Sequence, residues 1–284
     1  MNQKALKVMF FLSILVSLIT LWDHHLMGYL KNFIVLFHEI CHALATLLTG
    51  GVVEKISMHA NESGETIAFP SKMKGSFIFV VSAGYLGSSL FGGLLLHRGF
   101  SGKYEKHSLL VLAFTILFTT FKFSESGNLA FGTGIFWGTL FLIAGFFSRS
   151  VSSLALVFLG TSVSLYSIFD LFDFAHQIEN TDAGILARWI LNTNPGHGNN
   201  SASVTFLGYM IGILWSLITL LLVYLSIQKT FRHAEIQPEP DMPDAEKFPG
   251  EVTPEVMEWF FSRGLDLNGK PLPPELSSDN GKQG

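Results

Sequence analysis

The sequence predicts an all-α, polytopic membrane helix bundle with a short surface β-hairpin and a flexible acidic C-terminal tail. Of the 284 residues, 49% are apolar and only 14% are charged, and the mean hydropathy is +0.41, whereas soluble domains carry about 25% charged residues. The charges are also uneven, because residues 229–284 hold 11 acids and 6 bases, against 11 acids and 12 bases in residues 1–228. We therefore expect a membrane domain over residues 1–228 and a soluble acidic tail over residues 229–284.

The same composition excludes several classes of protein. The apolar content is too high for a disordered chain, and the single cysteine, Cys41, cannot build a disulfide scaffold. With 18 basic against 22 acidic residues there is no positive excess to attract nucleic acid. The partner that the composition implies is the lipid bilayer, so the chain is expected to be an integral, multi-pass membrane protein.

Apolar runs suited to spanning helices, which need about 20 residues, recur along the membrane domain. They are Leu6–Trp22, Met27–Leu48, Ser76–Leu96, Ser108–Phe121, Leu129–Phe147, Val151–Phe172 and Val204–Ile227. The fourth run is short, so its helix is tilted, extended by its flanks or not fully spanning, and about six to seven spans are predicted. The first run lacks small residues after its apolar core, which favours a retained helix over a cleaved signal peptide.

Two polar stretches interrupt these runs. Residues Val52–Phe69 follow a glycine helix stop and contain β-prone residues around a turn at Asn61–Gly64, which indicates a hairpin at the membrane surface. The second stretch precedes the last run and contains a short helical piece at Ala183–Leu191. The tail is rich in proline and acids and then contains a short helix near Pro254–Arg263.

The second run carries a pattern with direct chemical meaning, His38-Glu39-Ile40-Cys41-His42. On a helix, residues four apart share one face about 6 Å apart along the axis, so both imidazoles can ligate one Zn²⁺. Glu39, next to His38, can reach a metal-bound water as a general base. Ionisable residues inside a span are costly to bury and usually serve a function.

Two further interpretations of these residues stay open. His38, Glu39 and His42 could bond to one another as polar contacts between helices, although such contacts do not need this spacing. They could also form a transit site in a metal transporter. A transporter would spread polar residues along several spans, and the third to fifth runs contain few.

Phe37–Gly51 resembles the opening of the M50B-like, site-2-protease-related membrane metallopeptidases. The hairpin is similar too, as are the glycine-containing segment Ala83–Gly87 with Gly92-Gly93 and the element Thr181-Asp182-Ala183. The resemblance covers about residues 33–98 and 165–220. It departs from the family at Ile40-Cys41, which replaces the usual Leu-Gly, and it lacks the Leu-Asp-Gly motif of the better-known site-2 proteases, which leaves the third metal ligand less defined.

This resemblance implies a zinc metalloendopeptidase of the cell membrane that cleaves membrane-embedded or juxtamembrane segments of membrane proteins, with Glu39 as the general base. A helical substrate must unwind to expose its carbonyls, and the hairpin offers an edge to which an extended segment can add as a strand. The alternative is a catalytically silent relative that binds or escorts partner membrane proteins.

The third zinc ligand is predicted from topology together with the resemblance. With seven spans, the loop after the sixth run lies on the same side of the membrane as the hairpin. The reachable candidates in that loop are Asp170, Asp173, His176, Glu179 and Asp182. Five other acids are less suitable, being close in chain to the motif or flanking the fourth run: Glu54, Glu62, Glu65, Glu105 and Glu125. Only Asp182 matches the family's Asp-Ala element, so the predicted metal ligands are His38, His42 and Asp182.

Overall fold

The computed structural model describes residues 3–22, 24–61, 63–173, 178–193, 201–235, 254–267 and 270–271. The chain divides into two compact units, Met1–Ala234 and Glu235–Gly284. The predicted boundary between residues 228 and 229 therefore falls inside the last helix of the first unit, which runs to Glu235. Each unit is described by itself.

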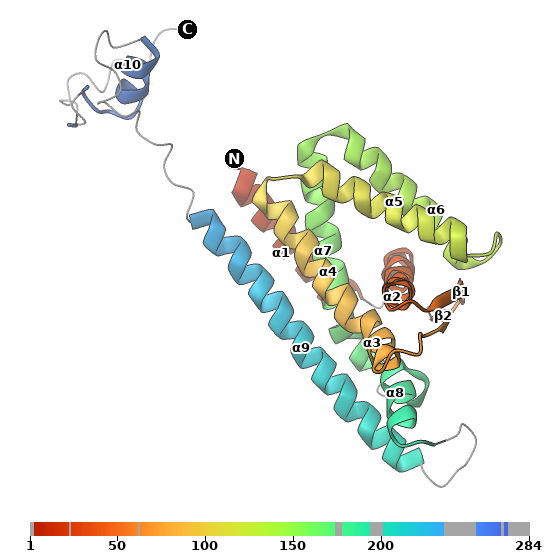
Figure 1. Ribbon diagram of the computed structural model, residues 1–284. Coiled ribbons are helices and arrows are strands. Elements are labelled where there is room, and N and C mark those ends of the chain that lie inside the picture. The colour runs from red at the N-terminus through yellow and green to blue at the C-terminus, as the bar shows by residue number, and fades with distance from the viewer. Residues whose placement is uncertain are drawn as a thin grey trace. The chain divides into compact units, whose positions relative to one another are not determined.

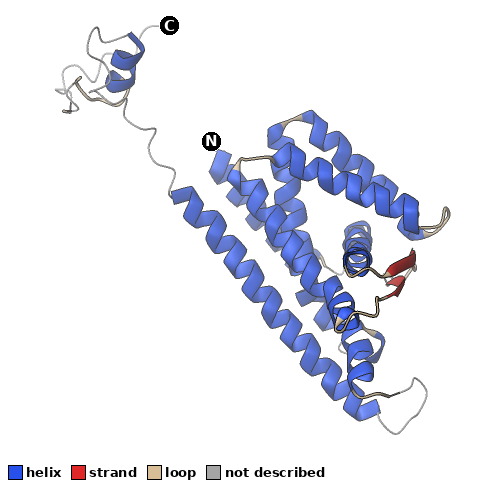
Figure 2. Ribbon diagram, in the orientation of Figure 1, coloured by secondary structure: helices blue, strands red, loops and turns tan. Residues whose placement is uncertain are grey.

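Helices dominate the first unit, and the strands of its described residues form one short hairpin (Figure 2). The α-helices are α1 (Gln3–Leu21), α2 (Gly28–Leu48), α3 (Ser76–Ser82), α4 (Ser88–Ser101), α5 (Glu105–Phe123), α6 (Leu129–Phe147), α7 (Arg149–Asp173), α8 (Asp182–Ile190) and α9 (Ser201–Glu235). A π-helical segment, Ala83–Gly87, joins α3 to α4. The strands are β1 (Val52–Met58) and β2 (Gly64–Phe69). The predicted all-α helix bundle with a small hairpin is confirmed.

The seven predicted apolar runs all fall on helices. Among the described residues, five helical segments are long and apolar enough to cross a membrane: 28–48, 76–101, 105–123, 129–147 and 202–229. Two shorter apolar segments, Leu6–Leu21 and Arg149–Leu165, lie in α1 and α7. The short fourth run is extended by its flanks, because α5 begins at Glu105 and reaches 19 residues.

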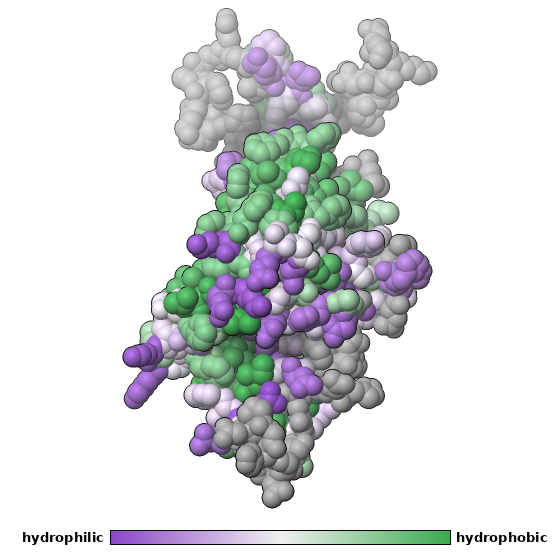
Figure 3. All heavy atoms as spheres, turned by 90° about the vertical axis from the view of Figure 1, so that its right-hand side faces the viewer, coloured by the Kyte–Doolittle hydropathy of each residue, from purple (hydrophilic) through white to green (hydrophobic). Residues whose placement is uncertain are grey.

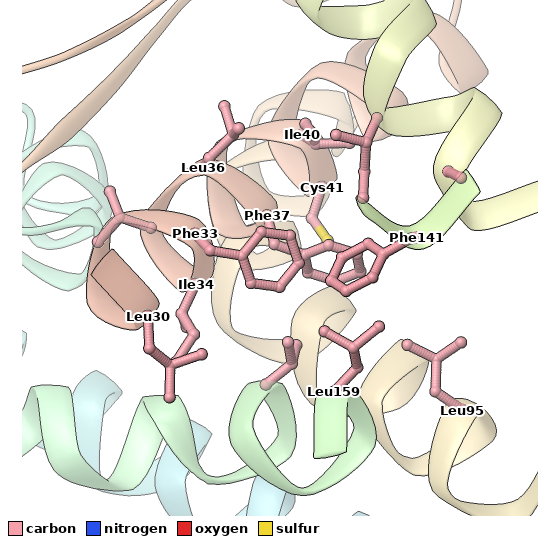
Figure 4. Packing of buried hydrophobic residues seen from close by; sticks show 14 of the residues in the cluster. Leu30, Phe33, Ile34, Leu36, Phe37, Ile40, Cys41, Leu95, Phe141 and Leu159 are labelled. Carbon is pink, nitrogen blue, oxygen red and sulfur yellow. The ribbon is translucent and has the colours of Figure 1, made fainter. Parts of the chain in front are cut away.

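Helix α2 lies in the interior of the first unit. Figure 1 shows it nearly end-on, whereas α4, α5, α6 and α9 run along the plane of the view, so α2 crosses these helices steeply. Its core side chains Phe33, Ile34 and Ile40 are at most 2% exposed. They pack with Phe141 of α6 and Leu159 of α7 (Figure 4). The helix that carries the predicted metal ligands is therefore held on several sides.

Helices α4 and α7 pack closely through small residues. A side chain at Gly92 would meet Ser164, and one at Gly160 would meet the backbone of Leu96. Close backbone approach at small residues is the usual way that membrane helices associate, since lipid offers no hydrophobic drive. The Ser153 hydroxyl adds a hydrogen bond of 2.6 Å to the Gly99 carbonyl. Helices α4 and α7 are thus packed tightly together, and both contact α2.

The hairpin starts where α2 ends. Thr49 caps α2, and Gly50 has a φ of 77°, a left-handed conformation that glycine adopts without strain. β1 and β2 then pair antiparallel from Val52↔Phe69 to Met58↔Gly64, with an irregularity between Val53 and Lys55. Met58 donates its N–H to the Asn128 side chain, which also caps α6, so β1 is tied to α6.

The hairpin has an apolar and a polar face. Ile56 and Met58 are buried at 1% and 3% exposure, whereas Glu54 and Glu65 are exposed. Figure 3, which views the side of the molecule where the hairpin lies in Figure 1, shows hydrophilic side chains gathered between apolar surfaces. The hairpin therefore lies on the side of the molecule where hydrophilic side chains gather.

In the second unit, α10 (Pro254–Phe261) falls where the tail helix is predicted. Arg263 lies over the Trp259 ring, and Leu265 pairs with Pro271 in an isolated bridge. The predicted proline-rich linker at residues 237–244 lies outside the described residues.

Candidate metal centre

His38 and His42 lie one turn apart on α2, where the four-residue spacing puts both rings on one face. Their Nε2 atoms are 3.0 Å apart, and each residue is 7% exposed. Two imidazoles on a mostly apolar helix are thus directed at one point.

Helix α8 brings Asp182 to the same point from 140 residues away in the chain. Oδ2 of Asp182 lies 3.0 Å from Nε2 of His38 and 3.0 Å from Nε2 of His42. Asp182 is the first residue of α8, and the Thr181 hydroxyl caps the helix by accepting the Gly184 N–H. The cap fixes where α8 begins and therefore where the carboxylate points.

The His42 ring is oriented by a backbone carbonyl. Its Nδ1 lies 2.7 Å from the Val80 oxygen and donates to it, which leaves the lone pair of Nε2 facing Asp182 and His38. Electron pairs converging in this way need a proton or a metal ion among them. A backbone carbonyl that fixes the ring is a common feature of metal-ligating histidines.

The carboxylate itself is strongly stabilised in its charged form. Burial alone would raise the pKa of Asp182, but the His42 and His38 imidazoles hold that pKa well below its usual range. Asp182 is therefore an anionic oxygen donor at neutral pH.

The space between these three residues is kept open by Gly84. A Cβ at this position would collide with Nε2 of both histidines. Gly84 belongs to the π-helical segment 83–87, and π-bulges occur frequently at functional sites. Tetrahedral ligands at about 2.0–2.1 Å from Zn²⁺ lie about 3.3 Å apart, close to the 3.0 Å separations here. The donor set and the cradle thus fit one zinc-sized cation.

Glu39 lies beside this group and under the hairpin. It is 5% exposed, and its Oε2 accepts a 2.7 Å hydrogen bond from the Thr66 hydroxyl on β2. A Cβ at Gly64, the first residue of β2, would lie 2.7 Å from Glu39 Oε1. The hairpin therefore contacts both carboxylate oxygens.

An aromatic pair closes another side of the centre. The Tyr85 ring meets the His38 ring edge-on at 4.7 Å between centroids, and the Trp215 ring of α9 stacks on Tyr85 at 5.4 Å. Trp215 of α9 thus packs beside His38 by way of Tyr85. The described residues of α9 contribute no ligand atom to the group of His38, His42 and Asp182.

The structure brings together four residues that the sequence singles out: His38, Glu39, His42 and Asp182. The first, third and fourth form the one group in the described part of the chain that could hold a metal ion.

Several acids are predicted from the sequence to be less suitable as ligands. Where the structure describes them, they do not lie in the group of His38, His42 and Asp182. Those on the hairpin or at the ends of α5 do not join it: Glu54, Glu65, Glu105 and Glu125. Five further residues that could have supplied a third ligand lie outside the described residues or have undescribed side chains: Glu62, Asp170, Asp173, His176 and Glu179.

Sequence reasoning missed the roles of Val80, Gly84 and Thr66. Gly84 lies in the glycine-containing segment that carries part of the family resemblance, but the sequence gives no sign that its nearest neighbours are the two imidazoles. The Val80 carbonyl leaves no trace in the side-chain sequence.

Comparison with known proteins gives one family. Residues 11–226 match the family model described as Peptidase M50B-like. No curated protein and no solved structure was found to match the chain.

Proposed function

The chain belongs to the peptidase M50B-like family, and on that premise we propose that it is a zinc metalloendopeptidase that cleaves membrane-protein segments in or beside the bilayer. The observation that carries the proposal is the convergence of His38, His42 and Asp182 at 3.0 Å separations. Two histidines and a carboxylate are a donor set used by catalytic zinc sites, which keep their fourth position for water.

His38, His42 and Asp182 would hold the zinc. When bound, zinc supplies Lewis acidity and lowers the pKa of a water in its open position to about 7. Val80 keeps the lone pair of His42 directed inward, and Gly84 leaves room for the ion. All of these contacts lie on elements packed around α2, so the site is preorganised.

Glu39 would move the proton. Its carboxylate accepts the proton of the attacking water and then delivers it to the nitrogen of the leaving amine. The low exposure of Glu39 keeps bulk water from competing for that proton. A carboxylate that is not a metal ligand but borders the metal group has the position this role requires.

The hairpin supports an extended substrate. Its sheet has two strands among the described residues, and β1 is tied at Met58 to Asn128, so β2 carries the outer edge. A segment that unwinds from a helix exposes N–H and C=O groups that this edge can pair. The substrates are therefore membrane proteins with segments that unwind at the bilayer surface.

We also propose how the chain is divided and where it is located. Residues 1–228 form the metallopeptidase domain in the cell membrane, and residues 229–284 form a soluble acidic tail. The spanning helices and the family support the membrane placement.

The decisive experiment compares the purified wild-type protein with Glu39→Gln in liposomes. Both are expected to hold zinc, because Glu39 is not a ligand, while cleavage of an unfolded model protein such as casein falls about 10²- to 10⁴-fold in the variant. His38→Ala and His42→Ala are expected to lose zinc together with activity.

A Glu39→Gln variant that cleaves as fast as the wild type would show that the mechanism is wrong. A zinc-loaded wild type that is as inactive as Glu39→Gln towards casein and towards reconstituted membrane proteins would favour the silent relative that binds partner proteins.

A further inference from the structure

We propose that Thr66, on β2, is a positioning residue for Glu39, so that the hairpin sets the orientation of the general base. The inference rests on the proposed function, because it assigns Glu39 the proton-transfer role. It adds a residue to the machinery that lies outside the metal-binding helix, on the strand that offers the substrate edge.

The hydroxyl of Thr66 makes two contacts with one residue. It lies 2.7 Å from Oε2 of Glu39 and 3.1 Å from the Glu39 backbone oxygen. A hydroxyl has one proton, so the shorter contact to the charged carboxylate is the stronger hydrogen bond. Glu39 has several rotatable bonds, and this bond selects one carboxylate orientation among those the side chain could adopt.

Thr66 is itself fixed by the sheet. It pairs with Ile56 across the strands, so both side chains lie on the same face, and Ile56 is 1% exposed. That face packs on α2, where Glu39 lies. Because the side chain of a β-branched residue has few rotamers, the hydroxyl cannot easily turn away.

Gly64 lies beside Oε1, the second carboxylate oxygen of Glu39. A Cβ there would lie 2.7 Å from Oε1 of Glu39 and 2.8 Å from a Val35 methyl, so the strand backbone closes over the carboxylate. With Thr66 on Oε2 and the strand beside Oε1, β2 confines both oxygens. A strand that binds substrate along its outer edge would thereby align the base and the scissile segment together.

The test uses the full chain in liposomes with zinc bound. Thr66→Val keeps the shape and removes the hydroxyl, and it is expected to lower kcat for casein about 10- to 100-fold with KM and zinc content unchanged, as for loss of a hydrogen bond to a charged group. Thr66→Ser should restore most of the rate. Thr115→Val on α5, which removes a hydroxyl bonded to its own helix at the Val111 carbonyl, serves as the control and should behave as wild type.

A second readout needs no activity. In the metal-free protein, Thr66→Val should lower the melting temperature by about 3 to 10 °C. This drop should be clearly smaller when Glu39 is already alanine, because the carboxylate is gone and only the longer contact to the residue 39 backbone oxygen remains. Drops of equal size in both backgrounds would overturn the proposal. So would a wild-type kcat for Thr66→Val alongside an inactive Glu39→Gln, which would leave the peptidase mechanism intact. An active Glu39→Gln would instead overturn the proposed function, while the melting cycle still tests the contact.

Discussion

Helices α2 and α9 are both apolar enough to cross a membrane, yet they occupy opposite environments. In α2, 78% of the spanning window is buried inside the protein, whereas in α9 the share is 17%. The exposed side chains of α9 are aliphatic and aromatic, such as Leu221 at 55% exposure. Two helices that both qualify as spans by length and composition therefore differ in their surroundings, because α2 faces other helices and most of α9 is not covered by the described protein.

The difference teaches where a bilayer protein can keep ionisable groups. His38, Glu39 and His42 would be costly on the lipid-facing surface of α9. On α2 they are bonded to Asp182, Thr66 and the Val80 carbonyl, and apolar neighbours surround them. Partners supplied by other elements, and not the hydropathy of the helix itself, decide whether a span can carry chemistry.

The largest effect is expected at Gly84, which faces α2. Gly84→Val fills the space between the two imidazoles, so zinc binding should fall at least about 100-fold, equal to about 2.7 kcal/mol. Zinc titration with a competing chelator measures it. Gly132→Val provides the matched control, because a Cβ at Gly132 meets nothing within 4 Å. Full zinc affinity in Gly84→Val would contradict the claim that the buried face of α2, and not an exposed helix face, holds the metal site.

Asp182→Ala should also lower zinc affinity strongly, because it removes one of the three proposed ligands, although somewhat less than Gly84→Val because both imidazoles remain to bind the metal. The same titration measures it. Asp170→Ala and Asp173→Ala, near the end of α7, should cost less than Asp182→Ala. A larger loss in either of those variants would move the third ligand away from α8.

The smallest expected effect is on stability, and it compares one substitution in α2 with one in α9. Phe33→Ala on α2 removes a side chain that is 1% exposed and contacts Trp137 and Phe141, so the free energy of unfolding should drop by about 3–5 kcal/mol. Leu221→Ala on α9 should change it by less than about 0.5 kcal/mol. Denaturation followed by tryptophan fluorescence in micelles compares them, and equal losses would show that α9 is packed against protein.

The sequence predicts the helices well because partition into a bilayer depends on local apolar content, which a run such as Leu129–Phe147 carries by itself. The hairpin is predictable for a similar reason, since its turn and its β-prone residues are adjacent in the chain. Four-residue spacing on a helix also brings His38 and His42 together without knowledge of the fold.

Contacts between distant segments are less accessible. Asp182 is expected at the site only through a family resemblance, because its carboxylate competes with several acids in the same loop. The Val80 carbonyl, the π-helical geometry around Gly84 and the bond from Thr66 to Glu39 depend on how α3 and β2 pack on α2. Hydropathy also does not predict the angle between helices, so it gives no sign that α2 crosses its neighbours steeply.

The distance in the chain between His42 and Asp182, 140 residues, has a consequence for biosynthesis. At about 5–20 residues per second, the ribosome adds Asp182 roughly 7 to 28 s after His42. During that interval the nascent chain holds two of the three candidate ligands and lacks the carboxylate that completes the set. The set of three is therefore complete only after residues 1–182 have been made, when segment 202–229 is the one candidate span of the described residues still to be added. The proposed peptidase would lack its full ligand set until then.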